Sequence, residues 1–230
     1  MKISSRKLLA VSLMTVLSFG ASASSENAEP AKTWSTSELQ STLVNMPEGD
    51  VARGEAQHNA LFCASCHGQR GEAPTLNWPS LAGQRAEYTY KMLMDYQSGL
   101  RNEDARAEVM TISAKNLTEQ DMADLAVFYA AQEKPQASKT STEVAEELVR
   151  KGDPARLITP CASCHGVDGQ GGKNESPAIA GQTKAYFMRT MKLYHGDHRS
   201  NDNDYAMRAV VMPLTDEERT ELAEYFAPVE

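Results

Sequence analysis

One six-residue motif, CASCHG, occurs twice in this chain of 230 residues, at positions 63–68 and 161–166, and the two copies contain all four cysteines. With four cysteines and five histidines in the chain, a given cysteine has Cys at +3 and His at +4 by chance in about 1 of 2,600 cases. The C-x-x-C-H pattern is typical of covalent haem attachment, in which two thiols add to the vinyl groups of one haem and the adjacent imidazole binds the iron. The duplicated motif therefore predicts two c-type haems.

The predicted thioether bonds form at Cys63, Cys66, Cys161 and Cys164, and the predicted proximal iron ligands are His67 and His165. Three other interpretations of the cysteines fit less well. A thioredoxin-like redox motif requires a βαβ context, and no β-rich stretch flanks either copy. A zinc site needs four ligands, which the two sets could supply only by combining or by recruiting others. Two disulfides, the usual state of cysteines in exported proteins, leave the paired histidines unexplained.

The similarity between the two copies extends well beyond the motif. Most matches lie 98 residues apart, and after one deletion in the second copy the spacing becomes 97. Such self-similarity indicates a duplicated domain of nearly a hundred residues, and two repeats fill the chain. The matches are Pro79 with Pro177, Ala82-Gly83-Gln84 with Ala180-Gly181-Gln182, Tyr88 with Tyr186, Tyr96 with Tyr194, Arg101 with Arg199, Leu117-Thr118 with Leu214-Thr215, and Leu125-Ala126 with Leu222-Ala223.

Within each repeat the sequence pattern is helical, so we expect an all-α fold. Thr118 and Thr215 each stand three residues before an acidic residue, which is typical of a capping box at a helix N-terminus. Apolar residues recur at spacings of three and four after both boxes. Pro160 directly precedes the second motif and predicts that the helix leading into that motif ends early. Further helices are expected over residues 36–45, 52–62, 88–96 and 186–194.

The N-terminus has the three regions of a cleavable signal peptide, namely basic residues, a short apolar stretch over 8–19, and Ala21-Ser22-Ala23 as a cleavage site. We therefore expect export to the periplasm. Removal of this peptide, which contains three cations and no acidic residue, would change the formal net charge from -8 to -11. The expected organisation is a signal peptide (1–23), a polar and mostly flexible segment (24–47), a first domain (48–135), a polar linker (136–142) and a second domain (143–230).

A methionine is the expected ligand on the other side of each iron. Met110 and Met207 each lie seven residues before a Leu-Thr pair. Both sit on the connection to the last helix of their repeat, where a thioether could reach the haem. Met212 also precedes that helix and is the alternative to Met207.

Three histidines outside the motifs offer another sixth ligand, because imidazole also binds haem iron. None has a histidine counterpart in the opposite repeat, so the duplication does not select any of them. We expect these side chains on the surface instead: His58, His195 and His198.

Two matched pairs of residues are expected to support the haems. Pro79 and Pro177 each lie 12 residues after a predicted proximal histidine. In haem domains of this class a proline carbonyl often accepts the ring N–H, which fixes the ring orientation; a plain turn is the alternative role for each proline. Arg101 and Arg199 are candidates to pair with haem propionates, although a solvated position suits an arginine nearly as well.

The CASCHG copies, the P-x-x-A-G-Q stretches and the Met-to-Leu-Thr spacing together resemble the dihaem cytochromes of the cytochrome c4 family over residues 48–230. The resemblance implies two class I cytochrome c domains related by an approximate twofold axis, with the haem propionate edges facing each other. It also implies electron transport in the periplasm. Transferred by position, His67 and Met110 would bind the iron of the first haem, and His165 and Met207 that of the second.

The expected function is electron transport between respiratory complexes, from a quinol-oxidising complex or dehydrogenase to a terminal oxidase or reductase. The alternative is a dihaem enzyme, such as a peroxidase or a thiosulfate-oxidising dehydrogenase, or the dedicated electron acceptor of one. Neither repeat has a long insertion that could build a substrate pocket, which favours a carrier. The net charge of -8 offers no basic surface for nucleic acid. We further expect a monomer with two packed domains, with peripheral membrane association left open.

Overall fold

The computed structural model describes residues 33–140, 142–173 and 175–228, all within the compact unit formed by residues 31–230. The predicted signal peptide lies outside the described residues. The described ranges contain helices and three isolated β-bridges but no β-strand, so the expected all-α class is confirmed. No helix in these ranges combines the length and the apolar content that crossing a membrane requires.

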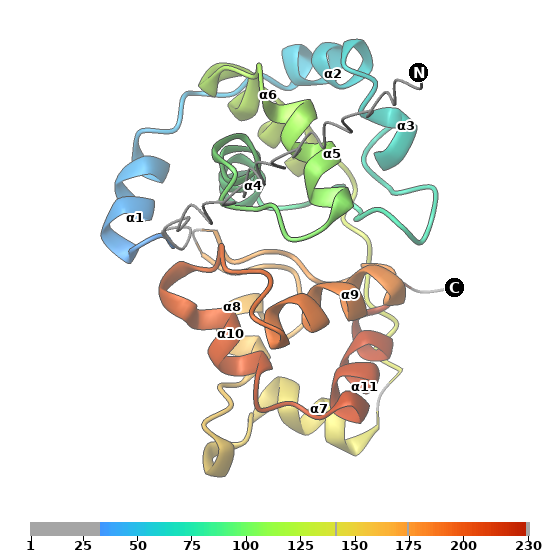
Figure 1. Cartoon of the computed structure of the whole chain (residues 1–230). Coiled ribbons are helices and arrows are strands. Elements are labelled where there is room, and N and C mark those ends of the chain that lie inside the picture. Colours follow the sequence, from blue (N-terminus) through green and yellow to red (C-terminus); the bar gives the residue numbers. More distant parts are fainter. Residues whose placement is uncertain (1–32, 141, 174, 229–230) are drawn as a thin grey trace, which may run out of the picture. The chain divides into compact units, whose positions relative to one another are not determined.

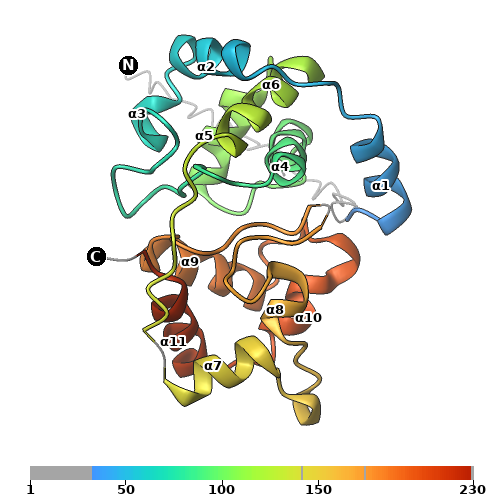
Figure 2. The same ribbon diagram turned by 180° about the vertical axis from the view of Figure 1, so that it is seen from behind.

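The helical elements follow the duplication seen in the sequence. They are α1 (Thr36–Val44), α2 (Val51–Ala60), α3 (Ala64–His67), α4 (Ala86–Ser98), α5 (Ala105–Ala114), α6 (Glu119–Ala130), α7 (Glu143–Arg150), η1 (Pro154–Arg156), α8 (Cys161–His165), α9 (Lys184–His195), η2 (Asn203–Tyr205), α10 (Ala206–Val211) and α11 (Asp216–Phe226). In the first repeat α6 packs against α2 and α4, and α5 packs against α4 (Figure 1). In the second repeat α11 packs against α7 and α9, and α10 packs against α9 (Figure 2).

The capping boxes predicted before the two last helices are both present. The Thr118 hydroxyl accepts from the backbone N–H of Asp121, and the Asp121 side chain accepts from the backbone N–H of Thr118. Thr215 and Glu218 make the same two bonds at the start of α11. Two N–H groups that a helix start leaves without partners are thereby satisfied at each box.

The crossing of α2 and α6 depends on a glycine and an ion pair. A Cβ atom on Gly54 would lie 2.1 Å from the carbonyl oxygen of Asp124, so a larger residue would push the two helices apart. Next to it Arg53 Nε donates to Asp124 Oδ2 over 2.7 Å, and this hydrogen bond holds the pKa of the carboxyl below its ordinary value. The crossing fixes the end of α2, which leads directly into the first CASCHG motif.

The segment before the second motif is built differently, as Pro160 predicts. Its helix, α7, ends at Arg150, and the chain then forms a turn in which the backbones of Asp153 and Ile158 exchange two hydrogen bonds (2.9 and 2.8 Å). Arg156 reaches from this turn to Glu218 on α11, with Nη2 2.6 Å from Oε1. An ion pair from this turn to the last helix thus adds to the packing of α7 against α11.

Two residues of the linker, Ser138 and Lys139, bind the second repeat through their backbones. Ser138 N–H donates to the carbonyl of Ala227 over 2.8 Å, and Lys139 N–H donates to that of Tyr225 over 3.1 Å. The linker therefore lies along the end of α11 in the second repeat.

Part of the polar N-terminal segment is also anchored. Trp34 Nε1 donates to Asp95 Oδ1 over 2.6 Å in the first repeat. In the second repeat, Asp204 N–H donates to the Trp34 carbonyl over 3.2 Å, and Asp204 Oδ2 accepts from Thr36 N–H over 3.2 Å. The helix expected over residues 36–45 is confirmed as α1, and the expectation of a mostly flexible segment is wrong for residues 33–47.

Candidate haem sites

All four cysteine thiols line a single cavity of about 820 Å³. Each pair spans a short helix, α3 or α8, and none of the four forms a disulfide. Burial raises the pKa of the Cys63 thiol and raises that of Cys161 to about 11, so both keep their protons near neutral pH. Free thiols in a shared cavity are the groups that addition to haem vinyls requires.

The two predicted proximal histidines are buried and held in the same way. His67 Nδ1 lies 3.1 Å from the Pro79 carbonyl oxygen, and His165 Nδ1 lies 2.9 Å from that of Pro177. A carbonyl only accepts, so Nδ1 carries the proton and Nε2 keeps a free electron pair. Burial lowers the pKa of both imidazoles and so keeps them neutral. His67 Nε2 is buried and has no hydrogen-bond partner among the described residues.

Met110 and Met207 line the same cavity as the histidines, whereas Met212 does not and is 52% exposed. Both cavity methionines are half-buried against the cores of their own repeats. They lie on the short helices α5 and α10, which directly precede the last helix of each repeat. The structure thus brings Met110 and Met207 to the cavity and places Met212, the alternative to Met207, at the surface.

Arg101 and Arg199 meet in the same cavity and are 5% and 2% exposed, so the solvated alternative is wrong for both. Each guanidinium donates to the same sulfur atom, Met92 Sδ, over 3.2 and 3.6 Å respectively. Arg101 also forms an ion pair with Glu103. Burial raises the pKa of the nearby Tyr186 phenol, but the two cations outweigh burial and lower that pKa to about 8.

This donor set fits two haems. Haem is a large apolar ring with two anionic propionates. The cavity has apolar walls, buried cations that include Arg101 and Arg199, four thiols, and histidines and methionines in both repeats. The unpartnered Nε2 of His67 is a group that an iron ion would satisfy. The residues are therefore those that covalent haem requires, in duplicate.

We expected His58 on the surface, but this side chain is fully buried. Its Nδ1 lies 2.8 Å from the hydroxyl of Tyr129, and its ring packs against Phe128 with centroids 5.1 Å apart. Burial lowers the pKa of this imidazole and keeps it neutral. The other two histidines, His195 and His198, are exposed as expected.

We expect Tyr129→Phe to lower the free energy of unfolding of the haem-loaded protein by about 1–3 kcal/mol, because it leaves His58 Nδ1 buried without a partner. Denaturant unfolding followed by circular dichroism measures this loss. The double variant His58→Phe/Tyr129→Phe removes both polar groups and is expected to lose less than the sum of the single changes. Strict additivity would show that the bond contributes nothing.

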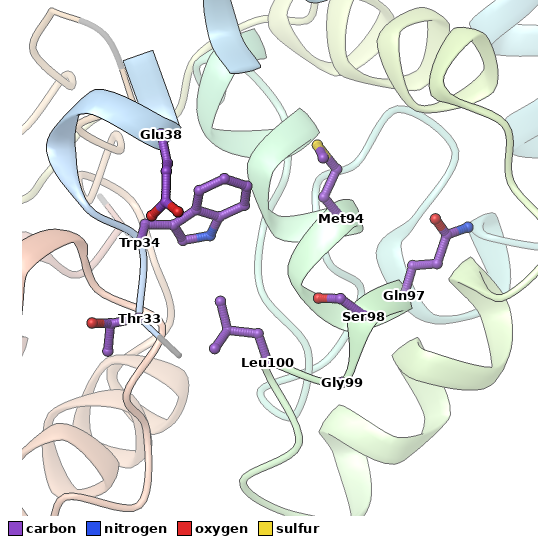
Figure 3. A pocket seen from close by; sticks show the side chains of 8 residues that line it. All are labelled: Thr33, Trp34, Glu38, Met94, Gln97, Ser98, Gly99 and Leu100. Atoms are coloured by element: carbon purple, nitrogen blue, oxygen red, sulfur yellow. The ribbon is translucent and has the colours of Figure 1, made fainter. Parts of the chain in front are cut away.

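A second cavity, of about 570 Å³, lies beside α1 and α4 and contains none of the predicted haem-binding residues. Figure 3 shows the Trp34 ring and the side chains of Met94, Ser98 and Leu100 around it. It has no thiol and no imidazole among its lining residues. The chemistry of the haem sites is therefore confined to the larger cavity.

Comparison with known proteins places these features in a family. A model of the cytochrome c family matches residues 51–130 and 155–229. Cytochrome c4 of Thiocapsa roseopersicina is 35% identical over 181 residues, which cover 77% of this chain and 91% of that protein. The thiosulfate dehydrogenase electron acceptor of Stutzerimonas stutzeri is 31% identical over 183 residues, covering 77% and 83%. The crystal structure of reduced cytochrome c4 from Pseudomonas stutzeri aligns with a TM-score of 0.70 at 28% identity, covering 79% of this chain and 100% of that one.

Proposed function

Because this chain belongs to the cytochrome c4 family, with two cytochrome c domains that each carry a covalently attached haem c, we propose that it carries electrons between redox proteins of the periplasm. Each haem iron supplies a one-electron couple. The protein binds the haems through Cys63 and Cys66 in a domain spanning residues 48–135, and through Cys161 and Cys164 in one spanning 143–230. The leader, residues 1–23, directs the chain to the periplasm.

One observation carries this proposal: in each repeat a histidine and a methionine line the same cavity. His67 and Met110 would hold the iron of the first haem, and His165 and Met207 that of the second. Two side chains on one iron leave no position for a substrate, which favours a carrier over an enzyme. A methionine and a histidine together also raise the reduction potential, as suits the oxidising end of a respiratory chain.

The remaining predicted residues act on the ligands and the haem edges. The carbonyls of Pro79 and Pro177 accept from the proximal imidazoles and hold their orientation. Arg101 and Arg199 place two positive charges in the shared cavity, where they neutralise haem propionates.

The donor is a quinol-oxidising complex or a dehydrogenase, and the acceptor is a terminal oxidase or reductase. A specific second candidate is suggested by the relative named as a thiosulfate dehydrogenase electron acceptor. In that role this chain accepts electrons from a sulfur-oxidising dehydrogenase instead of from a quinol-oxidising complex. Reduction assays with each purified donor distinguish the two candidates.

Carbon monoxide binding to the dithionite-reduced protein tests whether it is a carrier. Reduced haem with an open or weakly held position binds this gas, and the Soret band then shifts. We expect no shift at neutral pH, and no turnover when hydrogen peroxide or thiosulfate is added to the oxidised protein. Stoichiometric binding of the gas, or steady turnover of either compound, would assign an enzymatic role to one haem.

We expect electron transfer to a partner with a basic docking surface to slow as ionic strength rises from low to physiological values. The chain carries a formal charge of -8, which becomes -11 without residues 1–23. Opposite charge speeds encounter, and salt screens exposed charges over about 8 Å at physiological ionic strength. Stopped-flow oxidation at several salt concentrations measures the effect. A rate that stays flat or rises with salt indicates docking through an apolar face instead.

A further inference from the structure

The repeated Ala-Gly-Gln segments cross-connect the two repeats through their glutamines. Gln182 Oε1 accepts from the backbone N–H of Ser80 over 3.0 Å, and its Nε2 donates to the Ser80 carbonyl over 2.6 Å. Gln84 makes the same two bonds to Ala178, over 2.7 and 2.9 Å. All four residues are at most 7% exposed. The buried glutamine amide of each repeat therefore binds the backbone N–H and carbonyl of one residue in the other repeat.

The residue that is held follows the proline that supports a proximal histidine. The carbonyl of Pro79 and the N–H of Ser80 belong to one peptide group. Its oxygen accepts from His67 Nδ1, and its N–H donates to Gln182. An unbroken series of two hydrogen bonds thus connects a glutamine of the second repeat to the proximal histidine of the first.

A matching series connects a glutamine of the first repeat to the proximal histidine of the second. The peptide group between Pro177 and Ala178 accepts from His165 Nδ1 and donates to Gln84 Oε1. Both glutamines are fixed by the glycine before them, since Gly83 N–H donates to the Tyr129 carbonyl and Gly181 N–H to that of Phe226, each over 2.8 Å. The motif thereby anchors the glutamine to the last helix of its own repeat while its amide reaches into the other.

We propose that Gln84 and Gln182 are positioning residues through which each domain sets the reduction potential of the haem in the other domain. The proposal rests on the assignment of His67 and His165 as proximal ligands. Hydrogen bonds in series strengthen one another, because a peptide group that donates at its N–H becomes a better acceptor at its oxygen. A stronger bond at Nδ1 makes the imidazole more basic at Nε2.

The sign of the effect follows from this basicity. A more basic imidazole stabilises the ferric over the ferrous state, so the glutamine bond lowers the potential of the haem across the interface. Removing Gln182 is therefore expected to raise the potential of the first haem. Removing Gln84 is expected to raise that of the second.

Spectroelectrochemical titration of the haem-loaded Gln182→Leu variant tests the proposal. We expect the redox equilibrium of the first haem to change about threefold, or about 28 mV at 59 mV per tenfold for a one-electron couple. The wave of the second haem is expected to stay in place. Gln84→Leu is the matched variant and should move only the second wave. The two waves are assigned beforehand from Met110→Ala and Met207→Ala, each of which alters one haem.

Gln182→Glu separates the coupling from simple loss of an interface contact. A carboxylate still accepts from Ser80 N–H, but it cannot donate to the Ser80 carbonyl, so it removes one of the two bonds that leucine removes. We expect the potential of the first haem not to rise in this variant. An equal rise of the first potential in the glutamate and leucine variants, leucine variants whose waves do not move, or a single leucine variant in which both waves move would overturn the proposal.

Measurements on the wild-type protein test the assignment of the iron ligands. Two one-electron waves, and a methionine-to-iron charge-transfer band from each haem, establish the ligand sets of the proposed function. If those signals are present and the glutamine variants leave both waves in place, only the coupling fails. If the signals are absent, the ligand assignment itself fails.

Discussion

Met110→Ala is expected to abolish half of the methionine-to-iron charge-transfer band of the oxidised protein and to lower the potential of one haem. Met110 is half-buried and lines the cavity that contains His67. Its loss leaves the sixth position to water or to no ligand, and a haem without methionine has a lower potential. Near-infrared magnetic circular dichroism measures the band, and a potentiometric titration measures the shift. Met207→Ala is expected to do the same to the other haem.

Met212→Ala is the matched control for the second haem. This methionine is close to Met207 in sequence but is 52% exposed and outside the cavity lining. We expect the substitution to leave both bands at full intensity. If Met212→Ala removes a band while Met207→Ala leaves both, the ligand of the second haem is Met212 and not Met207.

The parts of the site that lie close together in sequence could be predicted, because local chemistry determines them. The thiols and the imidazole of each motif are adjacent residues, and a short helix brings them to one cavity without help from distant parts of the chain. The proline carbonyls also follow at a constant spacing of 12 residues and accept from the histidines as expected. The helices were predictable for a similar reason, since their capping residues lie three positions apart.

Contacts between distant residues were not predictable from these patterns. His58 is buried because Tyr129, 71 residues away, places a hydroxyl beside its ring. No periodicity within α2 reveals that partner. The second repeat has Arg156 and Phe226 at the matching positions, and there the arginine forms an ion pair with Glu218 instead. Duplication therefore preserved the haem-binding residues while the packing around them diverged.

The contacts between the two repeats also could not be predicted from the sequence. The Ala-Gly-Gln match is visible in the sequence, but a pattern shared by two repeats does not show that each copy binds the other. That result requires the pairs Gln182–Ser80 and Gln84–Ala178 to meet, at sequence separations of 102 and 94 residues. The sequence likewise gives no indication that the sulfur of Met92 accepts from two arginines. Buried polar groups of this kind become visible only when their partners are located in space.

Arg199 is the residue outside the iron ligands whose replacement should most affect both haems. Its guanidinium donates to Asn201 and Tyr88, which are neutral, and no carboxylate within the described ranges lies at ion-pair distance from it. Arg101, a second cation, shares the Met92 sulfur with it. The carboxylate of Glu103 is shared electrostatically by both guanidiniums, so two buried positive charges face one negative charge, and a further anion in the cavity would offset the excess. In the proposed function, a haem propionate is that anion.

Arg199→Gln is therefore expected to lower the potentials of both haems, because removing a positive charge favours the more positively charged ferric state. At an effective dielectric constant of about 20, a unit charge contributes on the order of 1–2 kcal/mol over about 10 Å, which is about tenfold in the redox equilibrium or about 59 mV. Arg199→Lys keeps the charge and should recover most of the loss, although lysine lacks the planar fork that reaches Asn201 and Tyr88 together. Spectroelectrochemical titration of the wild type and the two variants measures both haem potentials. Equal potentials in the glutamine variant and the wild type would mean that the charge of Arg199 is balanced elsewhere and does not act on the haems.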